Sequence, residues 1–178
     1  KRWLSWILNI RNFTKKRATA TEGRRRRGDG SRTREKGVLS MQVMERKTND
    51  LWFTEEQTPD MRMGLRIKQV LRHEETPYQR LLVVETEEWG RALVLDGAIQ
   101  ITEKDEFTYH EMMAHVPLCA HPAPCRVLVV GGGDGGVVRE VARHGAVSQI
   151  FLVDIDAEVT RASREFFPSV SCALDDPR

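Results

Sequence analysis

Residues 127–130 form a short apolar run rich in valine, which is typical of a buried parallel strand. A glycine-rich segment, residues 131–136, follows directly, and apolar residues return at helical spacing over residues 137–143. A second apolar run at residues 149–153 ends at Asp154. Because a strand, a glycine loop, a helix and a second strand follow one another, the pattern predicts the start of a doubly wound α/β domain. In such a domain a ligand binds at the carboxyl ends of the strands.

The chain before this domain shows a different pattern. Apolar and polar residues alternate over residues 65–71, which predicts a half-buried strand. Three further strands are expected, separated by turns around Trp89 and at Asp96-Gly97, and they cover residues 81–85, 91–95 and 98–102. Asp-Gly between two apolar runs is a strong hairpin signal. The pattern predicts a small antiparallel β module, which must pack on the next domain or on a second subunit because it buries little surface by itself.

A helix is expected at residues 105–118, between these two parts. Apolar residues recur there at helical spacing. One face is expected to carry Phe107, Glu111, Ala114 and Leu118, with its apolar stripe widened by Tyr109, Met112, Met113 and Val116. Tyr109 and His110 lie in the first turns, beside several carboxylates. A role of this pair in ligand binding and a purely structural role both fit the residues.

Gly131, Gly133 and Gly136 match the spacing G-x-G-x-x-G. We expect glycine there because the backbone must turn with positive φ and approach a ligand closely. Asp154 comes 18 residues after Gly136 and 23 after Gly131, which brackets the offset of about 20 residues at which an acid reaches a ribose. A carboxylate suits a ribose diol because it accepts hydrogen bonds from both hydroxyls. The alternative is a strand-to-helix turn without function, in which Asp154 caps the next helix.

Asp134 lies inside the glycine loop, where the pyrophosphate of a dinucleotide would rest on the helix N-terminus. Its negative charge repels phosphate and favours a cation. We therefore expect the ligand to be a nucleoside that carries positive charge, such as a sulfonium or an amine. A second interpretation, compatible with the first, is that Asp134 caps the following helix.

Charge is distributed unevenly along the 178 residues. Residues 1–40 hold 13 Lys or Arg against 3 Asp or Glu, whereas the rest of the chain holds 15 against 23. An acidic body suits a cationic small ligand and is a poor surface for nucleic acid. We expect three parts: a basic, disordered extension at residues 1–48, the β module at residues 49–104, and the connecting helix with an incomplete α/β domain at residues 105–178.

The basic extension contains Trp3, Trp6, Ile7 and Ile10, which are spaced for a short amphipathic helix. Its apolar run is far too short to span a bilayer, so no membrane contact is expected. A nucleic-acid-binding arm is one alternative. Another is upstream sequence read in frame before a natural start at Met41 or Met44.

Cysteine and histidine spacing argues against a metal site. Cys119, Cys125 and Cys172 lack the spacing of metal ligands and are odd in number, which favours a reduced, cytoplasmic compartment. His110 and His115 are five residues apart, which is the wrong spacing for two ligands on one helix face. No metal is therefore expected.

Several segments together resemble bacterial spermidine synthases. They are Leu51–Thr58, Leu93–Gln100, Glu103–Glu111, the glycine loop continuing into Arg139-Glu140, Val153–Asp156 and Leu174–Arg178. The resemblance covers residues 51–178 and implies a Rossmann-like, methyltransferase-like domain after the β module. It also implies an enzyme that transfers the aminopropyl group of decarboxylated S-adenosylmethionine, a co-substrate, to putrescine. The products are spermidine and methylthioadenosine, and no cofactor is required.

The resemblance further implies roles for single residues. Gln79 occupies the glutamine position that contacts methylthioadenosine, and Tyr109 and His110 match the pair that lines the polyamine channel. Asp134 matches the loop aspartate that holds an amine, and Asp154 matches the acid that binds the ribose hydroxyls. The glycine loop comprises Gly131, Gly132, Gly133, Gly135 and Gly136.

The general base of the family is an aspartate after the fourth strand of the sheet, which would lie beyond Arg178. No catalytic residue is therefore expected in this chain, which we expect to be inactive and poorly folded alone, with an exposed apolar sheet edge. The full-length protein is expected to be a homodimer or homotetramer joined through the β module. Alternatives are a methyltransferase-like enzyme of the same fold and a fragment that serves as a binding module. The sequence leaves open whether putrescine or another di- or polyamine is the acceptor.

Overall fold

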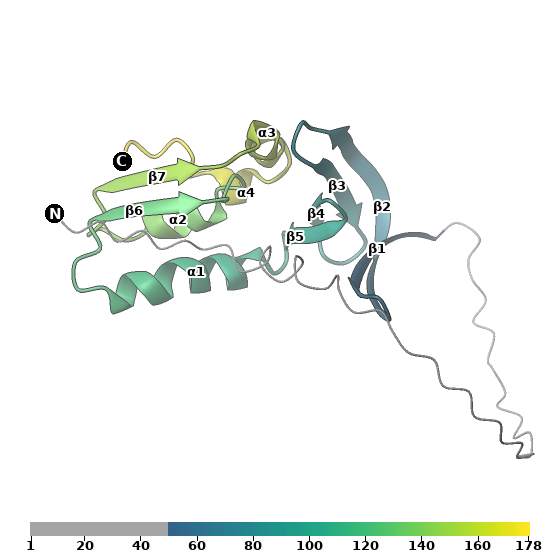
Figure 1. Ribbon diagram of the computed structural model, residues 1–178, viewed down its shortest axis with the longest axis horizontal. Helices are drawn as coiled ribbons and strands as arrows, with labels where there is room; N and C mark the ends of the chain where they lie inside the picture. The colour runs from purple at the N-terminus through teal and green to yellow at the C-terminus, as the bar shows by residue number, and fades with distance from the viewer. Residues whose placement is uncertain (1–49) are drawn as a thin grey trace, which may run out of the picture. The chain divides into compact units, whose positions relative to one another are not determined.

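The computed structural model describes residues 50–178, and the expected basic extension at residues 1–48 lies outside the described residues. Five antiparallel strands come first, paired in sequence order as an up-and-down meander (Figure 1). They are β1 (Leu51–Thr58), β2 (Met61–Glu75), β3 (Arg80–Thr86), β4 (Arg91–Leu95) and β5 (Ala98–Thr102). Asp96 and Gly97 both have positive φ, 50° and 81°, as a tight hairpin turn between β4 and β5 requires. The predicted β module and its turns are thus confirmed.

The alternating pattern did not predict β1, and it predicted only residues 65–71 of the longer strand β2. Most side chains of β1 are exposed, and its second half is polar, so no buried face marks it in the sequence. β2 pairs with β1 through its first half and with β3 through its second half. Its register with β3 shifts twice, between Ile67 and Gln69 and between Val70 and Arg72. Such bulges break the period of two by which a strand is recognised.

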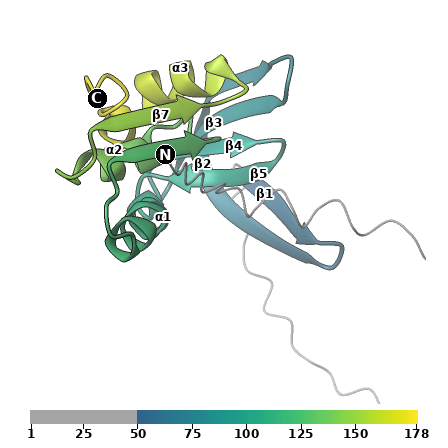
Figure 2. The ribbon, with the colours of Figure 1, turned by 60° about the vertical axis from the view of Figure 1, so that its left-hand side comes forward.

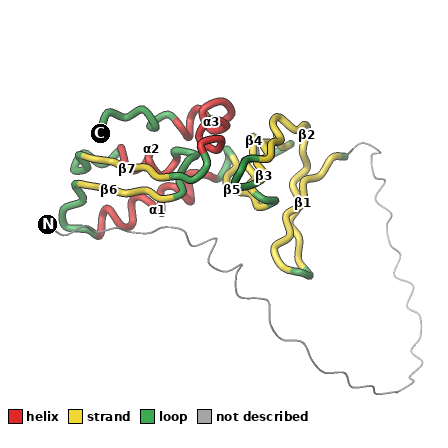
Figure 3. The backbone as a smooth tube through the Cα atoms, turned by 45° about the horizontal axis from the view of Figure 1, so that its top comes forward, coloured by secondary structure: helices red, strands yellow, loops and turns green. Residues whose placement is uncertain are grey.

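Helices and two parallel strands alternate in the rest of the chain (Figure 3). They are α1 (Glu106–Ala120), β6 (Arg126–Val130), α2 (Gly136–Ala142), β7 (Gln149–Val153), α3 (Ala157–Phe166) and α4 (Pro168–Ser171). β6 and β7 pair in parallel, with Leu128 opposite Phe151. An antiparallel module followed by a parallel α/β unit confirms the predicted fold class.

The β module packs against α3 and α4, as the sequence required of a sheet that small (Figure 2). Leu81, Val83, Leu93 and Ile101 of the sheet form one buried cluster with Val159, Ala162, Phe167 and Val170. Phe167 has no solvent exposure. Burial of a side chain of this size contributes roughly 1.5–3 kcal/mol, so Phe167 is a main link between the two parts.

A second cluster holds α1 and α2 against one face of the β6–β7 pair. Ala114, Leu118, Val141 and Val147 form its buried centre, with Val127 and Ile150 packed against it. Because side chains alternate along a strand, Phe151 and Val153 point to the other face. They are 44% and 55% exposed, so this face of the pair is apolar and open to solvent; the exposed sheet edge expected from the sequence stays a prediction.

One prediction about α1 was wrong. Phe107 was expected on the buried face, but it is 49% exposed, and Tyr109, Met112 and Val116 of the expected apolar stripe are exposed as well. The buried face instead carries Glu106 and His110 together with Ala114 and Leu118. These two polar side chains are buried because each has a charged partner, as described below.

No helix within residues 50–178 has both the length and the apolar character needed to cross a membrane.

Candidate active site

The glycine loop joins the end of β6 to α2 through two residues with left-handed backbone. Gly131 has φ 73°, and its N–H donates a hydrogen bond of 2.8 Å to the carbonyl of Val153 at the end of β7. Gly135, which precedes α2, has φ 86°. The expected positive φ is therefore right for Gly131 and wrong for Gly133 and Gly136, whereas Gly135 supplies the second left-handed turn.

Gly133 and Gly136 are needed for space. A Cβ on Gly133 would come within 2.9 Å of a carboxylate oxygen of Asp154. A Cβ on Gly136 would come within 2.2 Å of the imidazole ring of His110. The loop thus lets two predicted site residues approach its backbone, a role that G-x-G-x-x-G spacing alone does not reveal.

Asp154 lies just beyond the carboxyl end of β7 and is held by two backbone N–H groups. Its Oδ2 accepts a hydrogen bond of 2.8 Å from Gly133, and its Oδ1 accepts one of 2.9 Å from Asp156. The alternative in which Asp154 caps the next helix is wrong, because Asp156 is the N-cap of α3 and accepts from the N–H of Glu158. Each oxygen of Asp154 keeps acceptor capacity for a further hydroxyl donor.

Asp134 lies in the loop next to the start of α2. Its Oδ1 accepts a hydrogen bond of 2.7 Å from the N–H of Gly136 and lies 3.2 Å from Nε2 of His110. Burial raises the pKa of Asp134, but the contact with His110 and the backbone N–H groups outweigh burial and lower it below its usual value. Asp134 is therefore ionised at neutral pH. It also satisfies an N–H at the start of α2, so the capping interpretation holds beside the other.

His110 is completely buried between α1 and the loop. Its Nδ1 lies 2.5 Å from Oε2 of Glu106, one turn earlier on α1. Nε2 makes no well-aligned hydrogen bond among the described residues, so its contact with Asp134 is mainly one of charge. Burial lowers the pKa of His110, but Asp134 and then Glu106 outweigh burial and raise it above its usual value.

Arg139 on α2 completes this buried charge cluster. Its guanidinium donates two hydrogen bonds to Glu106, of 3.0 and 2.9 Å, and a third of 2.7 Å to Oε1 of Glu140. Burial lowers the pKa of Arg139, but Glu106 and Glu140 more than compensate and raise it. The sequence analysis assigned no role to Glu106 or Arg139. The spacing of four residues between Glu106 and His110 on a predicted helix was the available signal.

Tyr109 and Gln79 lie apart from the buried cluster. Tyr109 is 47% exposed, and its ring meets that of His110 edge-on with 5.5 Å between centroids. Gln79 donates from Nε2 to Oδ2 of Asp156 at 2.9 Å, and Thr76 donates to the same oxygen at 2.8 Å. Gln79 thus reaches the segment that follows Asp154 without contacting Asp154 itself. Asp156, which is 1% exposed, is a further anchor of this region that the sequence analysis missed.

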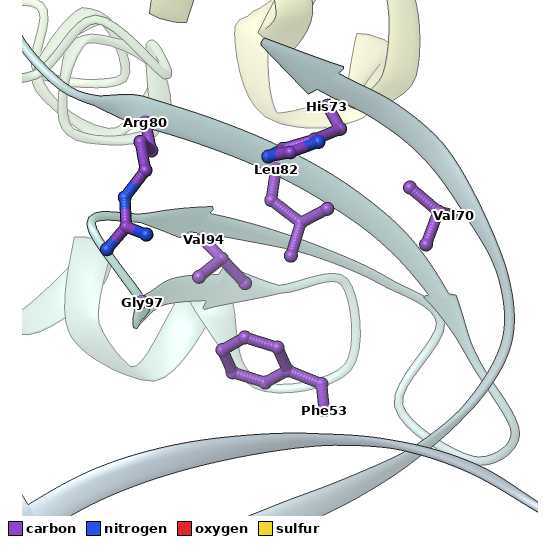
Figure 4. A pocket seen from close by; sticks show the side chains of 7 residues that line it. All are labelled: Phe53, Val70, His73, Arg80, Leu82, Val94 and Gly97. Atoms are coloured by element: carbon purple, nitrogen blue, oxygen red, sulfur yellow. The ribbon is translucent and has the colours of Figure 1, made fainter. Parts of the chain in front are cut away.

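A hollow of about 320 Å³ on the β module is separate from these residues (Figure 4). It is lined by apolar side chains of the sheet, the basic side chains of His73 and Arg80, and Gly97. None of the predicted site residues lines it. The carboxyl ends of β6 and β7, where Asp134 and Asp154 lie, remain the candidate active site.

The two histidines rejected as a zinc pair have different partners. Nδ1 of His115 lies 2.8 Å from Nε2 of His144, far along α1 from the Glu106–His110 contact. Within residues 50–178, no three side chains of the metal-ligating types gather closely enough to hold a metal ion.

The arrangement combines two carboxylates at the ends of parallel strands, the ionised Asp134 and the hydrogen-bonded Asp154. The backbone of the glycine loop lies close to both. Asp154 is suited to accept hydrogen bonds from a diol, and Asp134 is suited to bind a cation. A nucleoside bearing positive charge fits both demands. A phosphate group near Asp134 does not.

Two family models match the chain. The spermidine synthase tetramerisation domain matches residues 51–103, and the spermine/spermidine synthase domain matches residues 106–178. The polyamine aminopropyltransferase of Moorella thermoacetica is 56% identical over 128 residues, which is 72% of this chain and 45% of that protein. The polyamine aminopropyltransferase of Bacillus subtilis is 52% identical over 130 residues, covering 73% of this chain and 47% of that protein.

Solved structures agree with these matches. A crystal structure of spermidine synthase in complex with the transition state analogue AdoDATO has a TM-score of 0.70 and 40% identity, covering 76% of this chain and 47% of that one. Spermidine synthase from Thermotoga maritima has the same TM-score and identity and is covered to 49%. The chain therefore spans just under half the length of the relatives it matches.

Proposed function

The chain belongs to the spermidine synthase family, and we propose that it supplies the donor-binding half of a polyamine aminopropyltransferase. The proposed donor is decarboxylated S-adenosylmethionine, a nucleoside with a sulfonium and a primary amine. The observation that carries the proposal is the ionised carboxylate of Asp134 inside a glycine loop, 2.7 Å from the N–H of Gly136. This group favours a cationic nucleoside over a nucleotide.

In this proposal Asp154 binds the ribose hydroxyls of the donor. Both of its oxygens are fixed by backbone N–H groups, so the carboxylate is oriented before the ligand arrives. Gln79 contacts the methylthioadenosine part. Its hydrogen bond to Asp156, two residues after Asp154 in the chain, is compatible with this role. The five glycines of the loop, at 131, 132, 133, 135 and 136, shape the site: Gly131 and Gly135 make its left-handed turns, and Gly133 and Gly136 leave room for Asp154 and His110.

Asp134 binds an amine of the donor or of the polyamine acceptor. Tyr109, with its exposed ring, borders the path of the acceptor, and His110 lies behind Asp134. Putrescine is the proposed acceptor. A primary amine has a pKa near 10, so it must lose a proton before or during attack.

The proposed reaction is an in-line displacement. The lone pair of a neutral putrescine nitrogen attacks the methylene carbon bonded to the sulfonium, and a new C–N bond forms. The C–S bond breaks and its electron pair stays on sulfur, which gives methylthioadenosine, while a carboxylate takes the proton from the attacking nitrogen. Family resemblance assigns that base to an aspartate after the fourth strand of the sheet, and in this proposal the described residues contribute binding and orientation.

We propose further that the β module joins subunits, as a dimer or tetramer. The match of residues 51–103 to a tetramerisation domain supports this. The exposed side chains of Trp52, Met61 and Met63 on the outer strands are suitable contact residues. Three free and exposed cysteines support a reducing, cytoplasmic location.

Equilibrium binding to the 178-residue chain tests the proposed donor site. Asp134→Asn removes a charge-assisted contact worth about 1.5–3 kcal/mol, so the affinity for decarboxylated S-adenosylmethionine is expected to fall by roughly tenfold to a hundredfold. Methylthioadenosine lacks the amine and should bind the variant and the parent chain alike. Asp60→Asn removes the same charge from an exposed turn and serves as the control. Equal loss for both ligands, or no loss for either, would refute the role of Asp134.

A further inference from the structure

Both nitrogens of the buried His110 ring face carboxylate oxygens. Nδ1 lies 2.5 Å from Oε2 of Glu106, and Nε2 lies 3.2 Å from Oδ1 of Asp134. A neutral imidazole has one N–H donor and one lone pair, so in that state one nitrogen would turn its lone pair toward a carboxylate. Only the imidazolium has an N–H on each nitrogen and places a positive charge between the two carboxylates, the contact of Nε2 with Asp134 being one of charge and not an aligned hydrogen bond. The geometry therefore favours a protonated His110 at neutral pH.

The charges around the ring support the same ionisation state. Glu106 faces it from α1, Asp134 faces it from the glycine loop, and Arg139 of α2 lies behind Glu106. Tyr109 presents only a ring edge. Arg139 also pairs with the buried Glu140, which Arg143 contacts as well, so with His110 protonated the three carboxylates Glu106, Asp134 and Glu140 are balanced by three cations. With His110 neutral, the cluster would keep an uncompensated negative charge in a buried site, which is costly.

Arg139 fixes the far end of the cluster. It holds both oxygens of Glu106 with hydrogen bonds of 3.0 and 2.9 Å, which restrains the rotation of that carboxylate. Its Nε is anchored in turn on Glu140, which is 2% exposed. The orientation of Glu106 is thus set by α2, and Glu106 in turn sets the orientation of His110.

The contacts of Asp134 with Gly136 and His110 engage the same oxygen. The hydrogen bond from Gly136 and the contact with His110 both fall on Oδ1. The side chain is 17% exposed. A carboxylate held through Oδ1 is able to present Oδ2 to an incoming cation.

We propose that Glu106 and Arg139 are positioning residues that keep His110 as an imidazolium, which holds Asp134 ionised and leaves its Oδ2 for the amine of the ligand. This inference rests on the proposed function for the identity of the amine. It assigns His110 a place behind the binding carboxylate, because the ring is buried and both of its nitrogens are engaged by carboxylates.

The competing interpretation is that the cluster serves only to join α1 to α2. In that case, loss of Glu106 would destabilise the fold but leave the ionisation of the remaining groups as it was. Nitrogen-15 NMR of the histidine rings distinguishes the two, because the shifts of Nδ1 and Nε2 report protonation directly. Carbon-13 NMR of the Asp134 carboxyl reports whether the protonated His110 in turn keeps Asp134 ionised.

The experiment follows the five histidines and Asp134 of the 178-residue chain through a pH titration. In the parent chain His110 is expected to stay protonated at both nitrogens at pH values where exposed histidines are neutral. In Glu106→Gln its titration midpoint is expected to fall by at least about one pH unit, since an opposite charge at this distance shifts a pKa by about 1–3 units. The midpoint of Asp134 is expected to rise in the same variant.

Asp175→Asn is the matched control. It breaks another two-hydrogen-bond pair between arginine and carboxylate, Arg164–Asp175, at an exposed site. It should leave both titrations unchanged. Arg139→Lys keeps the positive charge but loses the planar guanidinium that donates to both oxygens of Glu106. It is expected to lower the titration midpoint of His110 less than Glu106→Gln does.

A neutral His110 at pH 7 in the parent chain would overturn the inference, even if no variant folds. An unchanged Asp134 titration in folded Glu106→Gln would also overturn it. These readouts need no ligand, so they are independent of the proposed function. Failure of decarboxylated S-adenosylmethionine to bind would count against the function and would leave the titrations as they are.

Discussion

His110 Nε2 lies 3.2 Å from Asp134 Oδ1, although the two residues come from different elements and only the glycine loop brings them together. The ring reaches this position because Gly136 has no side chain. A glycine, a buried histidine and a loop carboxylate therefore form one unit. The first three predictions test its parts and their surroundings.

Gly136→Ala is expected to disrupt this unit. The new Cβ would lie 2.2 Å from the His110 ring, which is enclosed and cannot move away freely. Overpacking of this kind costs about 1–3 kcal/mol or more, measured as the loss in free energy of unfolding by urea denaturation. Gly145→Ala is the control, because a Cβ there meets nothing within 4 Å and its φ is not positive. An equal effect of both substitutions would show that the close approach of His110 to the loop is not a constraint.

Stability should depend on pH in a direction set by His110. Its pKa is raised in the folded chain above the unfolded value of about 6.5. The protonated ring therefore contributes its full stabilisation below about pH 6.5, and this is lost as the pH rises through the raised pKa. His110→Gln should remove that decline from a series of urea denaturations between neutral and alkaline pH. Persistence of the same slope in the variant would assign the decline to another group.

Acid should destabilise the chain through different residues. The pKa values of Asp134 and Asp156 are lowered in the folded chain: burial raises them, but the partners of each carboxylate outweigh burial. Their stabilisation is present above the unfolded pKa of about 3.9 and is lost as the pH falls through the folded values. Asp156→Asn should weaken the acid dependence in urea denaturation and also loosen the contact with Gln79. A variant with the same acid dependence as the parent would contradict this assignment.

Phe167→Ala is expected to separate the β module from the helices. The side chain has no exposure and belongs to the cluster shared by β3, β4, β5, α3 and α4. A substitution of this type costs about 3–5 kcal/mol, a large part of the stability of an ordinary domain. Phe107→Ala removes the same group from a site that is 49% exposed and should cost much less. Comparable losses in calorimetry for the two variants would contradict the described packing.

The parallel strands and the glycine loop could be predicted from the sequence, because each is a local pattern of four to six residues, and Asp134 and Asp154 lie at the strand ends where the sequence put them. The sequence did not reveal that Glu106 and Arg139 lie on either side of one buried cluster. Their contact joins residues 33 positions apart, and charged residues on a helix are ordinarily solvated. The prediction that Phe107 lies on the buried face follows hydropathy and fails because the paired charges of Glu106 and His110 are buried there instead.

The strand β1 and the backbone of the loop were missed for a different reason. The polar sequence of β1 carries no buried face, so its pairing with β2 becomes evident only in the folded sheet. In the loop, glycine spacing indicated where glycine is needed but not why. Gly135 has positive φ, whereas Gly133 and Gly136 provide room for Asp154 and His110.

The most direct test of the proposed function compares two ligands that differ by one carboxylate. Binding of decarboxylated S-adenosylmethionine and of S-adenosylmethionine to the parent chain should be measured by calorimetry under the same conditions. The ionised Asp134 repels the extra carboxylate, so the decarboxylated form should bind at least about tenfold more tightly, equivalent to about 1.4 kcal/mol. Equal affinity, or tighter binding of S-adenosylmethionine, would contradict an aminopropyl donor site and favour a methyltransferase-like one.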